Sequence, residues 1–154
     1  MKRFPQPREY HPENLDKYKG SFPVVARSNL EAKVFRWMDI TESIVAWSSE
    51  SIAIKYYNPL DKKEHRYFPD LFFIQKKDNT YRGFLVEIKP ELQTKPPKQG
   101  RKKQQVYLYE AKTYIINYSK WEAAKKWCED TAKQKGISVE FRILTENDIN
   151  SLMN

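Results

Sequence analysis

Two short apolar runs joined by a polar turn constrain the fold of this chain most. Residues 71–74 are Leu-Phe-Phe-Ile and residues 84–86 are Phe-Leu-Val, and short uninterrupted apolar runs are typical of strands covered on both faces. The polar segment 76–80 between them indicates a turn. If residues 78 and 79 form the centre of a two-residue hairpin, paired residue numbers add up to 157 and Asp70 lies opposite Glu87.

Charged residues stand at the outer ends of both runs. Directly opposed residues on neighbouring strands have Cβ atoms about 4.5–5.5 Å apart, so Asp70 and Glu87 would repel each other beside a core. Lys89 shares a strand face with Glu87, because successive side chains alternate between faces. Buried charges cost free energy unless something compensates them, and a divalent cation held for phosphodiester hydrolysis would do so. Pro69 cannot donate to a ladder and indicates irregularity there.

Composition limits the class of protein and its partners. The chain has 154 residues, 40% of them hydrophobic, which is enough for one domain with a core and excludes a disordered tail. A net charge of +8 favours a polyanionic partner, with nucleic acid first and an anionic membrane surface second. The single cysteine, Cys128, excludes an internal disulfide and a Cys-rich zinc site, and we expect it in the core. Without a long apolar stretch or the apolar core of a signal peptide, we expect an intracellular protein.

The remaining pattern predicts an extended N-terminal arm, residues 1–26, and a single domain, residues 27–154. In the domain, a capping box at Ser28 and Glu31 opens a helix to about residue 39, and a second capping box at Ser119 divides the later helical region in two. The predicted strands cover residues 44–47, 52–56, 65–74, 81–89 and 137–143, and the predicted helices cover residues 28–39, 103–118 and 119–136, with a short one after Thr145. This order predicts an α/β fold with a central mixed sheet flanked by helices.

The charged residues form an ordered set that matches a known motif. Glu31 lies on the first helix, Pro69-Asp70 in a strand, and Glu87-Ile88-Lys89 at the end of the next strand. This set resembles the PD-(D/E)xK nuclease superfamily, whose core is restriction-endonuclease-like. The closer resemblance is to the head-completion nucleases of large tailed phages and to the related end-cleaving subunits of heteromeric transposases. It covers about residues 20–148 and is carried by stretches 27–31, 45–50, 65–70, 87–94 and 141–146.

The resemblance implies roles for four catalytic residues. Asp70 and Glu87 would be metal ligands, and Glu31 would complete the site through metal or water. Lys89 would orient the attacking water or steady charge on the scissile phosphate. The implied cofactor is Mg²⁺, with Mn²⁺ able to substitute, because Mg²⁺ prefers carboxylates and retained waters. Structural alternatives exist for each: Glu31 occupies the N3 position of its capping box, Asp70 could bond nearby backbone, and Glu87 and Lys89 could form an ion pair.

A basic loop, residues 90–103, directly follows Lys89. Such loops are usually solvated charge, but this position predicts contacts with DNA phosphates on either side of the cut. Gln93 and Thr94 could add neutral contacts. The predicted phosphate-binding residues are Lys95, Lys98, Arg101, Lys102 and Lys103. Lysines of the later helical region, Lys120 among them, form either a second DNA face or a solubilising surface.

These observations lead to the hypothesis of a Mg²⁺-dependent DNA endonuclease. The resemblance implies a phage enzyme that cuts packaged or branched DNA during head completion, with phage head or portal proteins as further partners. It places the protein in the host cytoplasm or with the virion, implies no membrane partner and leaves a homodimer open. Three alternatives remain: a non-catalytic DNA-binding or head structural protein, the catalytic subunit of a transposase or repair complex, and a ribonuclease.

Overall fold

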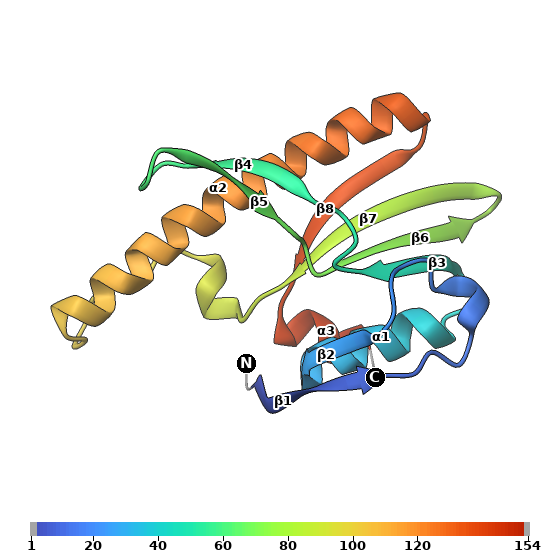
Figure 1. The fold of residues 1–154 in the computed structure, drawn as a ribbon, viewed down its shortest axis with the longest axis horizontal. Coiled ribbons are helices and arrows are strands. Elements are labelled where there is room, and N and C mark those ends of the chain that lie inside the picture. The colour runs from blue at the N-terminus through green and yellow to red at the C-terminus, as the bar shows by residue number, and fades with distance from the viewer. Residues whose placement is uncertain (1–2, 153–154) are drawn as a thin grey trace.

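A four-stranded mixed sheet forms the centre of the computed structural model, which describes residues 3–152 (Figure 1). In spatial order its strands are β3 (Ile44–Ser49), β6 (Leu71–Lys77), β7 (Thr80–Ile88) and β8 (Ser138–Leu144). The first three are antiparallel, and β8 runs parallel to β7. The predicted α/β class with a restriction-endonuclease-like core is therefore confirmed.

The β6–β7 hairpin has the predicted register. Its ladder runs from Leu71 opposite Val86 to Lys77 opposite Thr80. Asp78 and Asn79 both have positive φ angles, 53° and 63°, as a two-residue type I′ turn requires. The turn thus fixes which residues face each other at the far end of the hairpin, where Asp70 and Glu87 follow the last pair.

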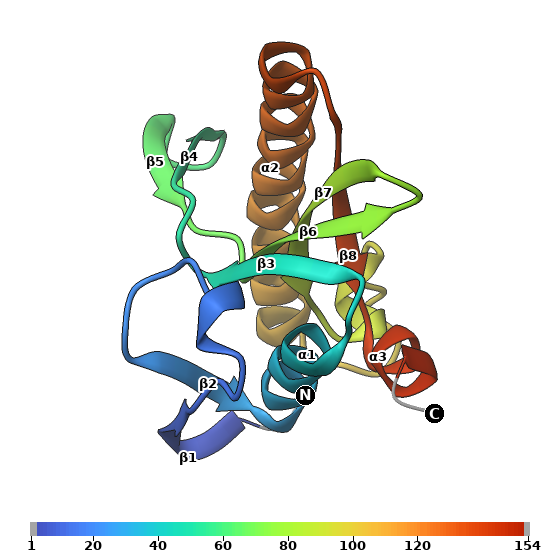
Figure 2. The same ribbon diagram turned by 90° about the vertical axis from the view of Figure 1, so that its right-hand side faces the viewer.

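Helices cover both faces of this sheet (Figure 2). On one face, α1 (Asn29–Ile40) and α3 (Glu146–Leu152) enclose a core that includes Phe84, Val86 and Ile88. On the other face, α2 (Gln104–Lys135) packs over Leu85 with Ala124 and Cys128. Side chains of β7 therefore alternate between two cores, and Glu87 belongs to the α2 face. No helix within residues 3–152 is long and apolar enough to cross a membrane.

One continuous helix, α2, replaces the two helices predicted for residues 103–118 and 119–136. The prediction of a break at Ser119 was wrong, because no glycine or proline lies between residues 104 and 135, and a local capping pattern does not end a helix that packing supports. The helix does end at the predicted Gly136, whose φ of 68° is left-handed and whose N–H donates to the Ala132 carbonyl. In Figure 1 the N-terminal half of α2 extends beyond the sheet.

The strand predicted for residues 65–74 is also divided. β5 (Lys63–Tyr67) pairs with β4 (Ile54–Asn58) in a separate two-stranded sheet, and β6 begins only at Leu71. Pro69 lies in the gap, where its missing N–H and fixed φ interrupt the ladder. The break sends the β4–β5 hairpin toward α2 and leaves Asp70 at the point where the chain turns into the central sheet.

The first 26 residues contribute to the core between the central sheet and α1. β1 (Arg3–Tyr10) pairs with β2 (Val24–Ser28), and a 3₁₀ turn, η1 (Leu15–Lys17), connects them. Tyr18 and Val24 are buried in the same cluster as α1. The division at residue 26 between an arm and a domain stays a prediction. Residues 1–2 of that arm and residues 153–154 of that domain lie outside the described residues.

Candidate active site

A polar cavity of about 120 Å³ lies where β6 and β7 separate. Glu31, Asp70, Glu87 and Lys89 all line it, together with Ile88, Pro90 and Gln93. The four residues come from α1, from the bend before β6 and from the end of β7. The fold therefore brings all four predicted catalytic residues to one cavity.

Backbone N–H groups bond both the side chain and the carbonyl of Asp70, but few groups offset the negative charge of its carboxylate. Its side-chain Oδ2 accepts a hydrogen bond from the Ile88 N–H at 2.7 Å, and its carbonyl accepts one from the Glu50 N–H at 3.0 Å. Burial raises the pKa of Asp70 well above its usual range, and the nearby Glu87 carboxylate raises it further. The ionised form of Asp70 is therefore disfavoured until a cation approaches.

Glu87 is buried and contacts one hydroxyl and one ammonium group. Its Oε1 accepts a hydrogen bond from the Tyr67 hydroxyl at 2.8 Å, and its Oε2 lies 3.5 Å from Lys89 Nζ. Burial raises the pKa of Glu87, although Lys89 and Tyr67 act in the opposite direction. Tyr67 fixes one carboxylate oxygen and leaves the other beside Lys89, toward the cavity.

Glu31 serves the start of α1 as well as the cavity. Its N–H donates to Ser28 Oγ at 3.1 Å, so the predicted N-cap at Ser28 is confirmed. Its carboxylate accepts a hydrogen bond from the Arg27 N–H, one residue before the cap. The structural role of Glu31 is thus present in the structure, and its catalytic role stays a prediction.

The donor set is suited to a divalent cation of the Mg²⁺ type. Among residues 3–152, no group of three or more Asp, Glu, His or Cys side chains converges enough to hold a cation alone. Mg²⁺, however, is typically held by one or two carboxylates and completes its coordination with water and substrate phosphate. Asp70 and Glu87 line one cavity and raise each other's energy when ionised, so a cation between them would relieve that repulsion.

Lys120, which the sequence assigned to a lysine-rich helical surface and not to the site, is a cation near this cavity. Its Nζ lies 5.6 Å from the Tyr67 ring centre and 5.7 Å from that of Tyr56, and it forms no ion pair within the described part of the chain. Burial lowers the pKa of Lys120, whereas Glu87 raises it. Lys120, Ala124 and Cys128 are spaced four apart, so a lysine on an otherwise apolar helical stripe was the available signal.

The predicted DNA-binding residues occupy the segment from η2 (Glu91–Thr94) to the start of α2. Gln93 lines the acidic cavity, whereas the Thr94 hydroxyl donates to the Glu91 carbonyl at 2.7 Å. Lys95 lies 3.6 Å from Glu91, and Lys102 lies 3.0 Å from Glu110. The remaining basic residues of the loop are exposed: Lys98, Arg101 and Lys103. Their contacts with DNA stay a prediction.

Comparison of the sequence with known proteins assigns the chain to a family. Residues 41–146 match the family described as TnsA-like endonuclease N terminal. The chain belongs to this TnsA-like endonuclease family. It is also 36% identical over 148 residues to the Head completion nuclease of Enterobacteria phage T4, a match that covers 92% of this chain and 91% of that protein. No solved structure matches.

Family membership confirms the PD-(D/E)xK resemblance. The TnsA-like segment contains Asp70, Glu87, Lys89 and the basic loop, whereas Glu31 precedes it. Nucleases of this type generally use divalent metal ions. The matched segment thus includes the two strands, β6 and β7, whose ends position Asp70 and Glu87.

Proposed function

We propose that this chain is a divalent-metal-dependent DNA endonuclease that acts during phage head completion. The chemistry is hydrolysis of a phosphodiester bond at the acidic cavity. The single observation that carries the proposal is the meeting of Asp70, Glu87 and Lys89 in that cavity. The match to a phage Head completion nuclease over nearly the whole chain supports the biological setting.

The proposed roles follow from the chemistry of each group. Asp70 and Glu87 hold the cation, with Mg²⁺ as the proposed ion and Mn²⁺ as a substitute. A bound divalent cation would supply water activation and would stabilise negative charge on the phosphate. Tyr67 keeps Glu87 in position through its hydrogen bond. A non-catalytic binder would gain nothing from two acids that face phosphates.

Two lysines provide positive charge on the same face of the sheet. Lys89, beside Glu87 Oε2, is placed to contact the scissile phosphate or the attacking water. Lys120 forms no ion pair within residues 3–152 and lies behind Tyr67, so we propose that it attracts the DNA strand toward the cavity. The basic loop would contact phosphates farther from the cut.

The test is a cleavage assay on linear, supercoiled and forked DNA, with RNA of the same sequence alongside. Purified protein should cut DNA with Mg²⁺ and not with EDTA. Asp70→Asn should lower the rate by about 10³-fold, the scale of lost electrostatic stabilisation in a dry site. We expect a similar loss for Lys89→Met and about a tenfold loss for Lys120→Met, since Lys120 does not line the cavity.

Lys125→Met is the matched control, because Lys125 is exposed on the same helix and, among residues 3–152, pairs with Glu122 alone. It should cut at the wild-type rate. Metal-independent cutting, or full activity of Asp70→Asn, would refute the proposed function. Cutting of RNA in preference to DNA would replace it with a ribonuclease.

A further inference from the structure

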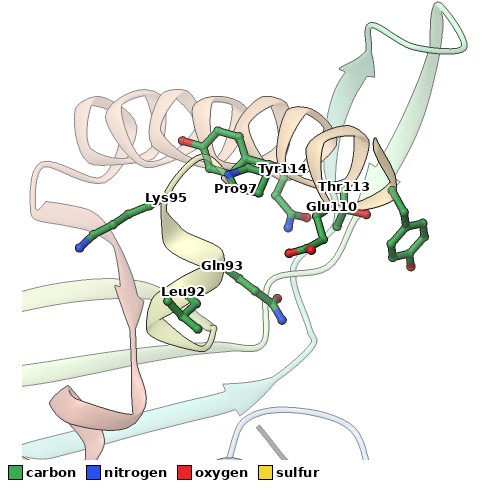
Figure 3. Close-up of a pocket in the computed structure, with 9 residues that line it drawn as sticks. Leu92, Gln93, Lys95, Pro97, Glu110, Thr113 and Tyr114 are labelled. Atoms are coloured by element: carbon green, nitrogen blue, oxygen red, sulfur yellow. The ribbon is translucent and has the colours of Figure 1, made fainter. Parts of the chain in front are cut away.

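A second cavity adjoins the acidic one. It measures about 240 Å³ and lies between η2 with its following loop and the first half of α2 (Figure 3). Gln93 lines both cavities, so they are neighbours along one surface. In Figure 3, Gln93 and Glu110 point toward the same space from η2 and α2.

A buried amide faces this second cavity. Asn117 is only 6% exposed, lines the cavity and has no side-chain hydrogen-bond partner in residues 3–152. Among the described residues, the fully buried side-chain nitrogen and oxygen atoms without a partner are Trp47 Nε1 and Trp121 Nε1. The Asn117 amide therefore keeps a small exposed area at the cavity, where a ligand or water can supply its hydrogen bonds. An asparagine amide offers a donor and an acceptor side by side, which is the pattern that matches the edge of a nucleobase.

The walls of the cavity are suited to a flat ring. Tyr109 and Leu92 are 73% and 88% exposed, which is high for such large apolar side chains. Tyr114 is fixed by an edge-on contact with Trp121, with ring centres 6.2 Å apart. Tyrosine side chains bind unpaired bases by stacking, and they do so with little sequence preference.

We infer that this cavity receives the base of a nucleotide next to the phosphate that is cut in the acidic cavity. The inference rests on the proposed nuclease function and names its substrate class. A Watson–Crick-paired base cannot enter a side cavity, so the base must leave the stack. The substrate is therefore DNA with an unpaired nucleotide at the cut, as at a fork, a flap or a strand end.

Binding to abasic DNA tests this inference without any protein variant. The cut is first mapped in Mg²⁺, and each nucleotide within three positions of it is then replaced by an abasic one. Affinity is measured by fluorescence anisotropy in EDTA. One position should show about a tenfold loss, on the scale of one base–aromatic stack, and the other positions should show little. An equal response at all positions would overturn the inference.

The same abasic scan is then repeated with Asn117→Leu. The matched control is Gln134→Leu, which removes an exposed amide from the same helix. Asn117→Leu should bind intact DNA about tenfold more weakly and should no longer sense the abasic position. The control should respond as wild type does. Full sensitivity in Asn117→Leu would overturn the inference, and if this variant does not fold, the wild-type scan decides.

Failure of this inference differs from failure of the proposed function. A protein that cuts DNA in Mg²⁺ but binds fully paired and abasic substrates alike would retain the function and lose the base-binding cavity. A protein that cuts nothing would lose the function itself. Tight binding of a peptide in the cavity, with no abasic effect, would make it a protein-docking site and would also overturn the inference.

Discussion

Two buried acidic regions of this protein have opposite surroundings. Asp39, at the end of α1, is fully buried, and its carboxylate accepts hydrogen bonds from the Tyr10 hydroxyl, the Glu13 N–H and the Asn14 N–H at 2.7–3.0 Å. Burial opposes its ionisation, but these donors outweigh burial and lower the pKa of Asp39. At the acidic cavity, burial prevails and raises the pKa values of Asp70 and Glu87.

The difference teaches that hydrogen-bond donors decide whether burial raises or lowers the pKa of a carboxylate. Asp39 is satisfied by the chain itself and joins the N-terminal segment to α1. Within the described residues, the Asp70 carboxylate accepts from one N–H donor and has a like charge beside it. A buried carboxylate that the protein leaves undercompensated is suited to an external cation.

The largest expected contrast is in stability without metal. Asp39→Asn should lower the free energy of unfolding by about 3 kcal/mol, because an amide cannot accept from all three donors and leaves buried groups unpaired. Asp70→Asn should raise it by about 1 kcal/mol, because a buried charge is removed while the acceptor for the Ile88 N–H remains. Urea unfolding at pH 7 in EDTA measures both values. Destabilisation of similar size in both variants would erase the proposed difference.

The pH dependence of stability should separate the two regions further. Because the pKa values of Asp70 and Glu87 are raised on folding, the native state binds more protons than the unfolded state between the unfolded values of about 4 and the raised values. Stability without metal should therefore fall as pH rises through that window. For Asp39 the sign is reversed: its contribution is present above the unfolded pKa and is lost as pH falls through the lowered folded value.

Urea unfolding between pH 4.5 and 8 checks this prediction. The stability advantage of the double variant Asp70→Asn/Glu87→Gln over wild type should be largest at high pH and should shrink on acidification, by about 1 kcal/mol over this range. A stability advantage that does not change with pH would show that folding does not raise the pKa values of these two acids.

The smallest expected effect separates the two roles of Glu31. Glu31→Gln can still accept a hydrogen bond at the start of α1, so stability should change by less than about 0.5 kcal/mol, while DNA cleavage should fall about tenfold. Ser28→Ala is the control, and it should cost about 1 kcal/mol of stability with cleavage unchanged. The opposite pattern, in which Glu31→Gln cuts normally, would leave only the capping role.

The sequence was informative where one local interaction decides the structure. The Asp78-Asn79 turn set the β6–β7 register, and that register placed Asp70 near Glu87 as predicted. The sequence was misleading where packing overrules a local signal. Ser119 carries a capping pattern inside a continuous helix. Pro69 is a different case, because its own chemistry, which had indicated irregularity there, divides what the apolar pattern indicated as one strand.

Parts of the site that depend on the chain path could not be predicted. Tyr67 reaches Glu87 only because the chain turns at Pro69 and places β5 over the sheet. Lys120 reaches the same region only because α2 does not break at Ser119. Asn117 faces a cavity that forms between η2 and α2, two elements that no local pattern relates. The positions of these residues depend on contacts between segments that are distant in the sequence.

Binding of Mn²⁺ to the DNA-free protein tests most directly whether the acidic cavity is a cation site. The free Mn²⁺ signal in electron paramagnetic resonance is followed as wild type, Asp70→Asn/Glu87→Gln and Asp39→Asn are titrated, each shown to be folded by circular dichroism. Wild type and Asp39→Asn should remove free Mn²⁺ from solution, and the cavity variant should not. Equal binding by all three proteins would contradict the assignment of Asp70 and Glu87 as metal ligands.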